Sequence, residues 1–265
     1  MHLKIHPTAI VDKKAKLADD IEVGPYAIIG PNAEIAKGAV IGSRVTIDGY
    51  TAIGERTRIF TGAVIGSPPQ DLKYKGQKTF LVIGKNNIIR EYVTMNPGTA
   101  EGTSTSVGDG NLFMAYAHVA HNCVIGSNCI IANLGTFAGH VTLEDRVIIG
   151  GLAAVHQFVR VGKMAIIGGC SKVVQDIPPF STCDGNPARV YGLNLVGLRR
   201  AGMPKKAQTE LKKAFRILFH SGLILKHSVE KVKKEVELIE EVKYLLNFLK
   251  DSERGISKGG LQSRL

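Results

Sequence analysis

A large apolar residue recurs at every sixth position along most of this chain of 265 residues. The first run has no gap: Ile5, Val11, Leu17, Val23, Ile29, Ile35, Ile41, Ile47, Ile53, Ile59 and Ile65. A period of six fits neither an amphipathic helix, whose period is about 3.6, nor a two-sided strand, whose period is 2. It indicates a short strand followed by a sharp turn, with three hexads closing one triangular coil. The recurrent apolar residue then points into the coil.

Stacked coils would share one continuous core, because each coil alone cannot bury its apolar residues. A small or β-branched residue, such as Ala27 or Thr51, usually follows the apolar position by four and fills the same corner. The hexads pause at about residues 67–81 and again at about 97–106. Loops that interrupt so regular a repeat are candidates for function rather than for packing.

The hexads end before Pro178 and Pro179, since consecutive prolines cannot continue a backbone ladder. Beyond Ala188 the apolar spacing becomes helical, with helices expected near residues 193–201, 204–220, 228–239 and 240–250. Ser228 is expected to cap the third of these, and the tail after Ser252 to be unpacked. The sequence therefore predicts a mainly β fold: a parallel β-helix over residues 1–187 with two ejected loops, then an α-helical domain over residues 188–265.

The net charge is +11, which favours an anionic partner such as a phosphate-bearing substrate, an acidic protein or a nucleic acid. Residues 188–265 carry 17 Lys and Arg against 8 Asp and Glu, so most of the excess lies there. The four cysteines form no CxxC pair and are expected to be reduced, mainly as small core residues. Neither a signal peptide nor a membrane-spanning run is present, which predicts a cytoplasmic protein without an integral membrane segment.

Histidines gather in the middle of the repeat. Because three hexads close a coil, residues eighteen apart should stack on one face, and His121, Gly139 and Gln157 form such a column. His118, His140 and His156 lie beside it. An imidazole that accepts a proton, next to a glycine amide that stabilises an oxyanion, is an arrangement suited to acyl transfer. Two alternatives stay open: the histidines are merely solvated, or His118, His121 and His140 bind zinc.

Several segments resemble one family closely. They are Gln70 to Tyr74 (QDLKY), Ala117 to His121 (AHVAH), Ala138 to Val141 (AGHV), Ala154 to Phe158 (AVHQF) and Gly168 to Ser171 (GGCS). The chain is similar to the bacterial UDP-N-acetylglucosamine O-acyltransferases, which open lipid A synthesis. The resemblance implies a left-handed parallel β-helix in a homotrimer, with sites between neighbouring subunits. It implies transfer of a 3-hydroxyacyl group from acyl carrier protein to a UDP-sugar, with no cofactor, no metal and no nucleic-acid partner.

The resemblance also implies roles for individual residues. His121 matches the general base, and the Gly139 amide matches the oxyanion donor. Gly169 matches the position that sets acyl-chain length. The remaining matches are expected to bind or position substrate: Gln70, Asp71, Lys73, Asn96, His118, His140, His156, Gln157, Asn194 and Arg200.

The chain also departs from the family pattern. Asn122 follows the base where well-known members have Asp, and Asn96 replaces a histidine that contacts the sugar. Val196 and Ala201 replace an acidic and a basic residue of the tail. Both a 3-hydroxyl and a 3-amino acceptor therefore stay open. The rivals are the N-acyltransferase of the same pathway, which carries a domain before its hexads, a zinc carbonic anhydrase of the same fold, and a scaffold without activity. Because the hexads begin by Ile5, no room is expected for that extra domain.

Overall fold

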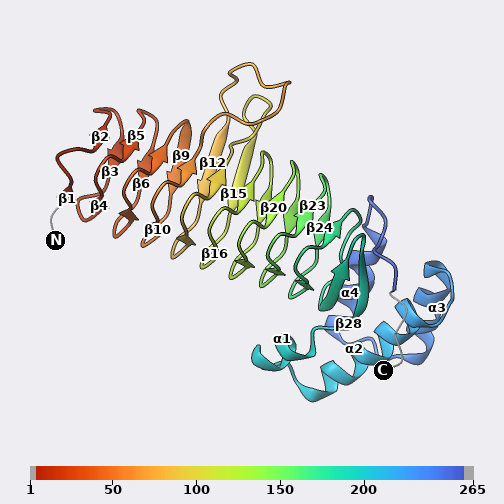
Figure 1. The fold of residues 1–265 in the computed structure, drawn as a ribbon. Coiled ribbons are helices and arrows are strands. Elements are labelled where there is room, and N and C mark those ends of the chain that lie inside the picture. The colour runs from red at the N-terminus through yellow and green to blue at the C-terminus, as the bar shows by residue number, and fades with distance from the viewer. Residues whose placement is uncertain (1–3, 260–265) are drawn as a thin grey trace.

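The computed structural model describes residues 4–259, and in it short strands stack into a three-sided prism (Figure 1). Each side of the prism is a sheet, and successive strands of the chain pass from one sheet to the next. All ladders between coils are parallel, and most join residues eighteen apart, as Lys4 does with Glu22. The triangular coil that the hexads predict is therefore present.

The first sheet consists, in spatial order, of β1 (Lys4–Ile5), β4 (Glu22–Val23), β7 (Val40–Ile41), β10 (Arg58–Ile59), β13 (Ile88–Ile89), β16 (Leu112–Phe113), β19 (Ile130–Ile131), β22 (Ile148–Ile149), β25 (Ile166–Ile167), β27 (Ser181–Gly185) and β28 (Ala188–Leu193). The second consists of β2 (Ile10–Val11), β5 (Ile28–Ile29), β8 (Thr46–Ile47), β11 (Val64–Ile65), β14 (Thr94–Met95), β17 (His118–Val119), β20 (Thr136–Phe137), β23 (Ala154–Val155) and β26 (Lys172–Val173). The third consists of β3 (Lys16–Leu17), β6 (Glu34–Ile35), β9 (Tyr50–Ile53), β12 (Phe80–Ile83), β15 (Ser104–Val107), β18 (Val124–Ile125), β21 (Thr142–Leu143) and β24 (Arg160–Val161).

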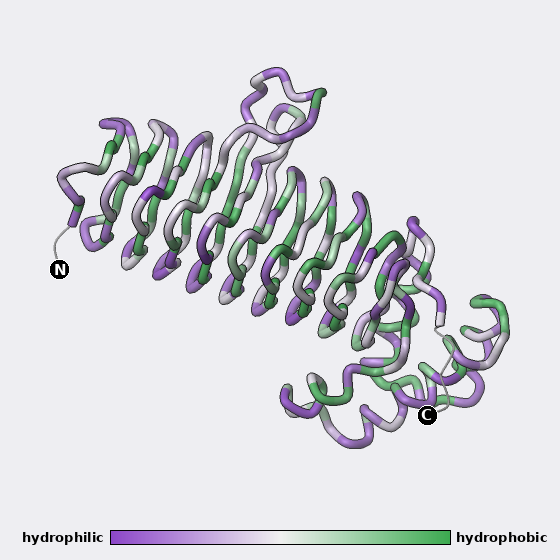
Figure 2. Tube along the Cα trace, viewed as in Figure 1, coloured by the Kyte–Doolittle hydropathy of each residue, from purple (hydrophilic) through white to green (hydrophobic). Residues whose placement is uncertain are grey.

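The recurrent apolar residues fill the prism. Ile47, Phe113 and Phe137 are fully buried, and the small residues four positions later, such as Ala27, are buried beside them. Figure 2 shows apolar residues recurring in every coil, whereas the protruding loops are largely hydrophilic. Burial of this kind contributes about 25 cal/mol per Å² of apolar surface. A shared core therefore explains why the period of six survives for so many coils.

Two loops leave the prism along one edge (Figure 1). Residues 66–79 connect β11 with β12, and residues 96–103 connect β14 with β15. The two loops are joined where the amide of Lys78 donates to Glu101 Oε2 at 3.0 Å. Both lie between the second and third sheets, so we call this edge the loop corner: the turns that follow β11, β14, β17, β20 and β23.

Beyond the coils the chain forms a β-hairpin that the sequence pattern does not predict. β27 continues the first sheet in parallel with β25, and β28 returns antiparallel to β27. The strands therefore extend to Leu193, past the two prolines that were expected to end them. The division at residues 187 and 188 lies within this hairpin, and it remains a proposal.

Four helices follow within the described residues: α1 (Leu195–Arg200), α2 (Lys205–His220), α3 (Leu225–Glu235) and α4 (Glu240–Lys250). The prediction that Ser228 caps the third helix is wrong. That helix begins at Leu225, three residues before Ser228, and its N-cap residue is Ile224, which has an extended backbone. Ser228 therefore lies inside the helix, where it is buried. No helix within residues 4–259 is long and apolar enough to cross a membrane.

The tail after Ser252 is packed as far as Gly259, contrary to expectation. The amide of Asp176 donates to Gly255 O, and the amide of Ser257 donates to Asp176 O, each at 2.9 Å. This pairing satisfies backbone groups that the end of the hexads would otherwise leave exposed. The rest of the predicted tail, residues 260–265, lies outside the described residues.

Candidate functional site

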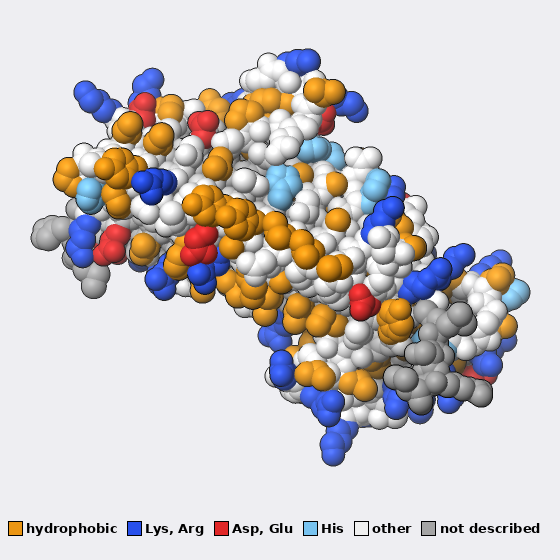
Figure 3. All heavy atoms as spheres, in the orientation of Figure 1, with side chains coloured by type: hydrophobic (Ala, Val, Ile, Leu, Met, Phe, Trp, Pro, Cys, Tyr) orange, Lys and Arg blue, Asp and Glu red, His pale blue; other side chains and the backbone are white. Residues whose placement is uncertain are grey.

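The loop corner brings the predicted column together. His121 follows β17, Gly139 follows β20 and Gln157 follows β23, each at the same position of its turn. The ladders β17–β20 and β20–β23 pair residues eighteen apart, as the hexad count requires. Figure 3 shows histidine side chains along the face below the protruding loops.

His121 is oriented from both ends of its ring. Its Nδ1 lies 3.0 Å from Asn122 Oδ1, which is hydrogen-bond distance, and its Nε2 lies 3.8 Å from Asp71 Oδ2 in the first loop. The side chain is only 16% exposed. His121 Nε2 and the Asp71 carboxylate therefore lie close together at the base of the first loop.

Gly139 lies directly against this imidazole. A Cβ at Gly139 would come within 2.5 Å of His121 Nε2, so only glycine fits under the ring in this position. Its turn position is the one that Pro7, Pro25 and Pro31 occupy in earlier coils. Proline has no N–H, and the amide of Gly139 likewise has no hydrogen-bond acceptor among the described residues. That N–H is therefore available to a ligand beside His121.

Two further histidines, His118 and His140, flank His121, and the pKa of each is lowered. His118 Nδ1 lies 2.6 Å from Thr94 Oγ1 on the preceding coil, and burial, followed by the nearby His121, lowers the pKa of His118. The His140 ring meets His121 edge-on at 5.2 Å and stacks on Phe158 at 4.7 Å. Burial and then His121 lower the pKa of His140, while Asp71 opposes this shift. The only imidazole of the three that faces a carboxylate within 4 Å in the described residues is His121.

His156 and Gln157 extend the column toward the C-terminal end and are exposed. Arg254 of the tail reaches His156: its Nη2 lies 3.1 Å from His156 Nδ1 and donates to Val174 O at 3.1 Å. Arg254 was not expected at this site, because nothing in the sequence predicts that the tail folds back over the last coil.

Asn96 fixes the base of the first loop. It is buried, and its Nδ2 donates to Ser67 O at 3.0 Å and to Pro68 O at 3.2 Å. Its Oδ1 is buried without a partner among the described residues. Asn96 therefore holds the loop that carries Asp71, and its expected contact with substrate stays a prediction.

The structure does not place every predicted residue against His121. Gly169 lies in the turn between the first and second sheets, and Gln70 and Lys73 are exposed in the first loop. Arg200 is exposed at the end of α1. Asn194 caps α1, where its Oδ1 accepts from the Gly197 amide and its Nδ2 donates to Met164 O. The roles expected for these five residues stay predictions.

No group of three His, Cys, Asp or Glu in residues 4–259 is arranged to hold a metal. His118, His121 and His140, the three zinc ligands considered from the sequence, are accordingly not arranged as one ligand set. Their contacts are instead with Thr94, Asn122 and Phe158.

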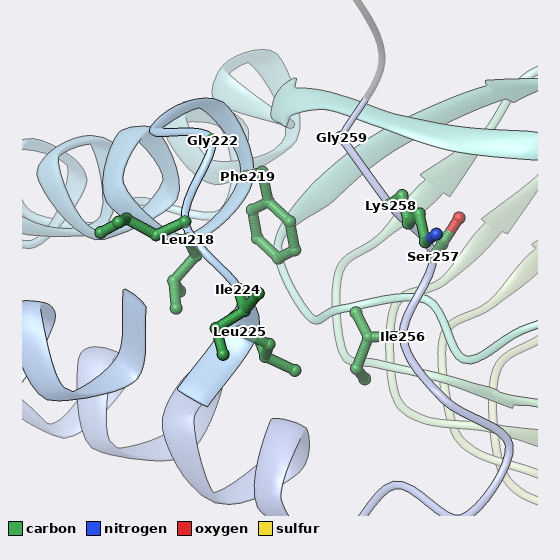
Figure 4. A pocket seen from close by; sticks show the side chains of 10 residues that line it. Leu218, Phe219, Gly222, Ile224, Leu225, Ile256, Ser257, Lys258 and Gly259 are labelled. Carbon is green, nitrogen blue, oxygen red and sulfur yellow. The ribbon is translucent and has the colours of Figure 1, made fainter. Parts of the chain in front are cut away.

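An apolar pocket near the tail is remote from this site. The pocket has a volume of about 420 Å³. It lies between the end of α2, the start of α3 and the tail, and Phe219, Ile224 and Ile256 are among the residues that line it (Figure 4). Lys258 is its one ionisable lining residue within the described chain. It therefore lacks the acid–base groups that the loop corner provides.

Comparison with known proteins gives a consistent result. A family model described as UDP N-acetylglucosamine O-acyltransferase, domain 2, matches residues 176–257. A model of bacterial transferase hexapeptides (six repeats) matches residues 104–136. An acyl-[acyl-carrier-protein]--UDP-N-acetylglucosamine O-acyltransferase of Anaeromyxobacter dehalogenans is 49% identical over 257 residues, which cover 97% of this chain and 100% of that protein. Its counterpart in Aliarcobacter butzleri is 49% identical over 253 residues, covering 95% and 97%.

Solved structures agree. The UDP-N-acetylglucosamine acyltransferase from Campylobacter jejuni has a TM-score of 0.90 at 41% identity, covering 97% of this chain and 100% of that one. The Arabidopsis enzyme has a TM-score of 0.85 at 34% identity, covering 96% and 100%. The fold is the predicted left-handed parallel β-helix of hexapeptide repeats followed by helices. The chain belongs to the UDP-N-acetylglucosamine O-acyltransferase family.

Proposed function

We propose that the chain transfers a 3-hydroxyacyl group from acyl carrier protein to the 3-position of the glucosamine of UDP-N-acetylglucosamine, or of its 3-amino analogue. This is the first step of lipid A synthesis. The proposal rests on one observation: His121 Nε2 lies next to Gly139, whose backbone N–H donates to no acceptor among the described residues. The two residues occupy the same turn position on successive coils. Family membership at 49% identity over nearly the full length supports the proposal.

In this mechanism His121 is the general base. As the acceptor oxygen or nitrogen attacks the thioester carbonyl, its proton passes to His121 Nε2. The carbonyl oxygen becomes an oxyanion and accepts a hydrogen bond from the Gly139 N–H. The C–S bond then breaks, and the leaving thiolate takes the proton back from His121. The thioester is already activated, so the proposed reaction needs neither a metal nor an organic cofactor.

The neighbouring residues would position the sugar. Asp71 and Lys73 project from the first loop, and His118, His140, His156 and Gln157 line the column below. Burial lowers the pKa of His118 and of His140, which makes these two rings weaker bases. Neutral imidazoles can both donate and accept hydrogen bonds to sugar hydroxyls.

The C-terminal helices suit an acidic carrier. A groove along α2 is lined by Lys212, Lys213, Arg216 and His220. Acyl carrier protein is the partner that the net charge of this segment would attract electrostatically. We further propose a cytoplasmic homotrimer in which Gly169, Asn194 and Arg200 reach the site from a neighbouring subunit. That arrangement would account for their distance from His121 within one chain.

The test combines mass spectrometry with one substitution. Purified protein is given 3-hydroxyacyl carrier protein of several chain lengths and a UDP-sugar with either a 3-hydroxyl or a 3-amino group. We expect one product mass, equal to ester or amide formation, and a loss of about 10³-fold or more in His121→Ala. Unimpaired transfer by His121→Ala, or no transfer to either sugar, would refute the proposal.

A further inference from the structure

The side-chain oxygen of Asn122 has three hydrogen-bond partners. Its Oδ1 lies 3.0 Å from His121 Nδ1, 3.2 Å from the backbone nitrogen of Thr99 and 3.0 Å from Thr99 Oγ1. Thr99 belongs to the second loop, residues 96–103, which leaves the preceding coil at the loop corner. The backbone N–H of Asn122 donates to Thr105 Oγ1 at 2.8 Å.

These contacts determine which end of the Asn122 side chain faces His121. A backbone N–H can only donate, so the atom that faces the Thr99 amide must be the oxygen rather than the NH₂ group. The same oxygen faces His121 Nδ1, so Nδ1 must carry the proton. His121 Nε2 then holds the lone pair that a general base needs.

An asparagine next to His121 has to be held in one orientation, whereas an aspartate would not. The two oxygens of a carboxylate are equivalent, but an amide presents unlike ends and can pair with either tautomer of a histidine. If the amide turned over, its Nδ2 would donate to Nδ1, and the imidazole proton would move to Nε2. The Asp71 carboxylate, 3.8 Å from Nε2, favours a proton there electrostatically.

We propose that Thr99 is a positioning residue that holds the Asn122 amide with its oxygen toward His121 and thereby keeps His121 in the tautomer protonated at Nδ1. This inference rests on the proposed function, in which His121 is the base. It gives the second loop a part in the reaction that neither the repeat nor the histidine column predicts. It also explains how the site works with Asn122 in place of a carboxylate.

The chain offers a matched control. Thr103 lies in the same loop, and its hydroxyl donates to Ala100 O at 2.7 Å rather than to Asn122. Thr99→Val and Thr103→Val each remove one loop hydroxyl, but only the first removes a donor to Asn122 Oδ1. We expect Thr99→Val to lower kcat by about 5- to 10-fold with little change in KM, as loss of one hydrogen bond predicts. Thr103→Val should stay within about twofold of the unmodified protein.

A double-mutant cycle separates the tautomer from general loop damage. In an Asn122→Asp background either carboxylate oxygen can accept from Nδ1, so Thr99→Val should cost less than about twofold there. Thr99→Ser, which keeps both donors, should retain most of the turnover. An equal cost of Thr99→Val in the unmodified protein and in the Asn122→Asp background, or no cost in either, would overturn the inference.

The tautomer of His121 can also be measured directly, in an experiment that does not depend on enzymatic activity. Nitrogen-15 spectra of the labelled full-length protein, with the His121 signals assigned from His121→Gln, should show a protonated Nδ1 and an unprotonated Nε2. Thr99→Val should shift these signals toward the other tautomer. A protonated Nε2 in the unmodified protein would refute the inference. If unmodified protein acylates no UDP-sugar, the proposed function fails, and these spectra alone then decide the role of Thr99.

Discussion

Gly139 lies so close beneath the His121 ring that a single added carbon would meet Nε2 at 2.5 Å. The two residues belong to successive coils, and the amide of the next residue, His140, donates to His121 O at 3.0 Å. The proton acceptor and the free amide are thus fixed relative to each other by the ladder itself. Coil stacking, rather than a flexible loop, sets this distance.

The first prediction concerns this contact. Gly139→Ala should lower kcat by about 100-fold, because the new methyl group must displace the imidazole by the order of an ångström. Steady-state kinetics measure the effect, and circular dichroism confirms that the coils remain folded. Gly192→Ala is the control, since a Cβ there meets no atom within 4 Å. Equal activity of the two variants would contradict the contact.

A second prediction concerns alkaline stability. The Tyr244 hydroxyl of α4 donates to Glu144 Oε2 at 2.7 Å, and burial, followed by this bond and the Glu144 charge, raises the pKa of Tyr244. In the unfolded chain the phenol titrates near pH 10. The folded state therefore holds the proton more tightly, so this stability is fully present below about pH 10 and is lost at higher pH.

Tyr244→Phe should accordingly lower the free energy of unfolding by about 1 kcal/mol at pH 7. The difference from the unmodified protein should narrow as the pH rises above about 10. Urea unfolding between pH 7 and 11 measures it. A difference that is constant or grows over this range would show that Tyr244 does not titrate as the contact requires.

A third prediction concerns a buried asparagine ladder. Asn111 Oδ1 accepts from the Cys129 amide at 2.7 Å, and the amide of Asn111 donates to Asn87 Oδ1 at 2.9 Å. Asn111→Ala leaves the buried Cys129 N–H without an acceptor and should cost about 2–3 kcal/mol of unfolding free energy. Thermal or urea unfolding measures this loss. Asn32→Ala, at an exposed turn, should change the same quantity by less than about 0.5 kcal/mol.

A fourth prediction concerns the thiols, all of which are free. Burial raises the pKa of Cys123 and Cys183 to about 12 and that of Cys129 to about 11. Few thiolates form on these residues near neutral pH, and reagents cannot reach them. Cys170 is exposed, so it is replaced in the test, and a Cys170→Ser variant should react with a thiol reagent only after unfolding. Rapid reaction of the native variant would show that a coil opens.

The sequence predicts the coils well because the recurrent apolar residue of each hexad shows which side chain points into the core. Counting by eighteen was enough to place Gly139 against His121. The same count fails across the loops, where Thr94 pairs with His118 at a separation of 24. Thr99 was missed for this reason, since its contact with Asn122 depends on the path of an inserted loop. The hairpin β27–β28 was missed because two prolines suggested that pairing ends there.

The two ejected loops also leave the ladder undisturbed. Tyr50 pairs with Phe80, and Phe80 pairs with Ser104, although each loop inserts extra residues between them. Because the coil closes behind each insertion, the length and composition of a loop can change without altering the packing of any hexad. The loop corner is therefore the place where descendants of one scaffold can diverge in the molecules they recognise. The prism can be inherited intact while the loops evolve on their own.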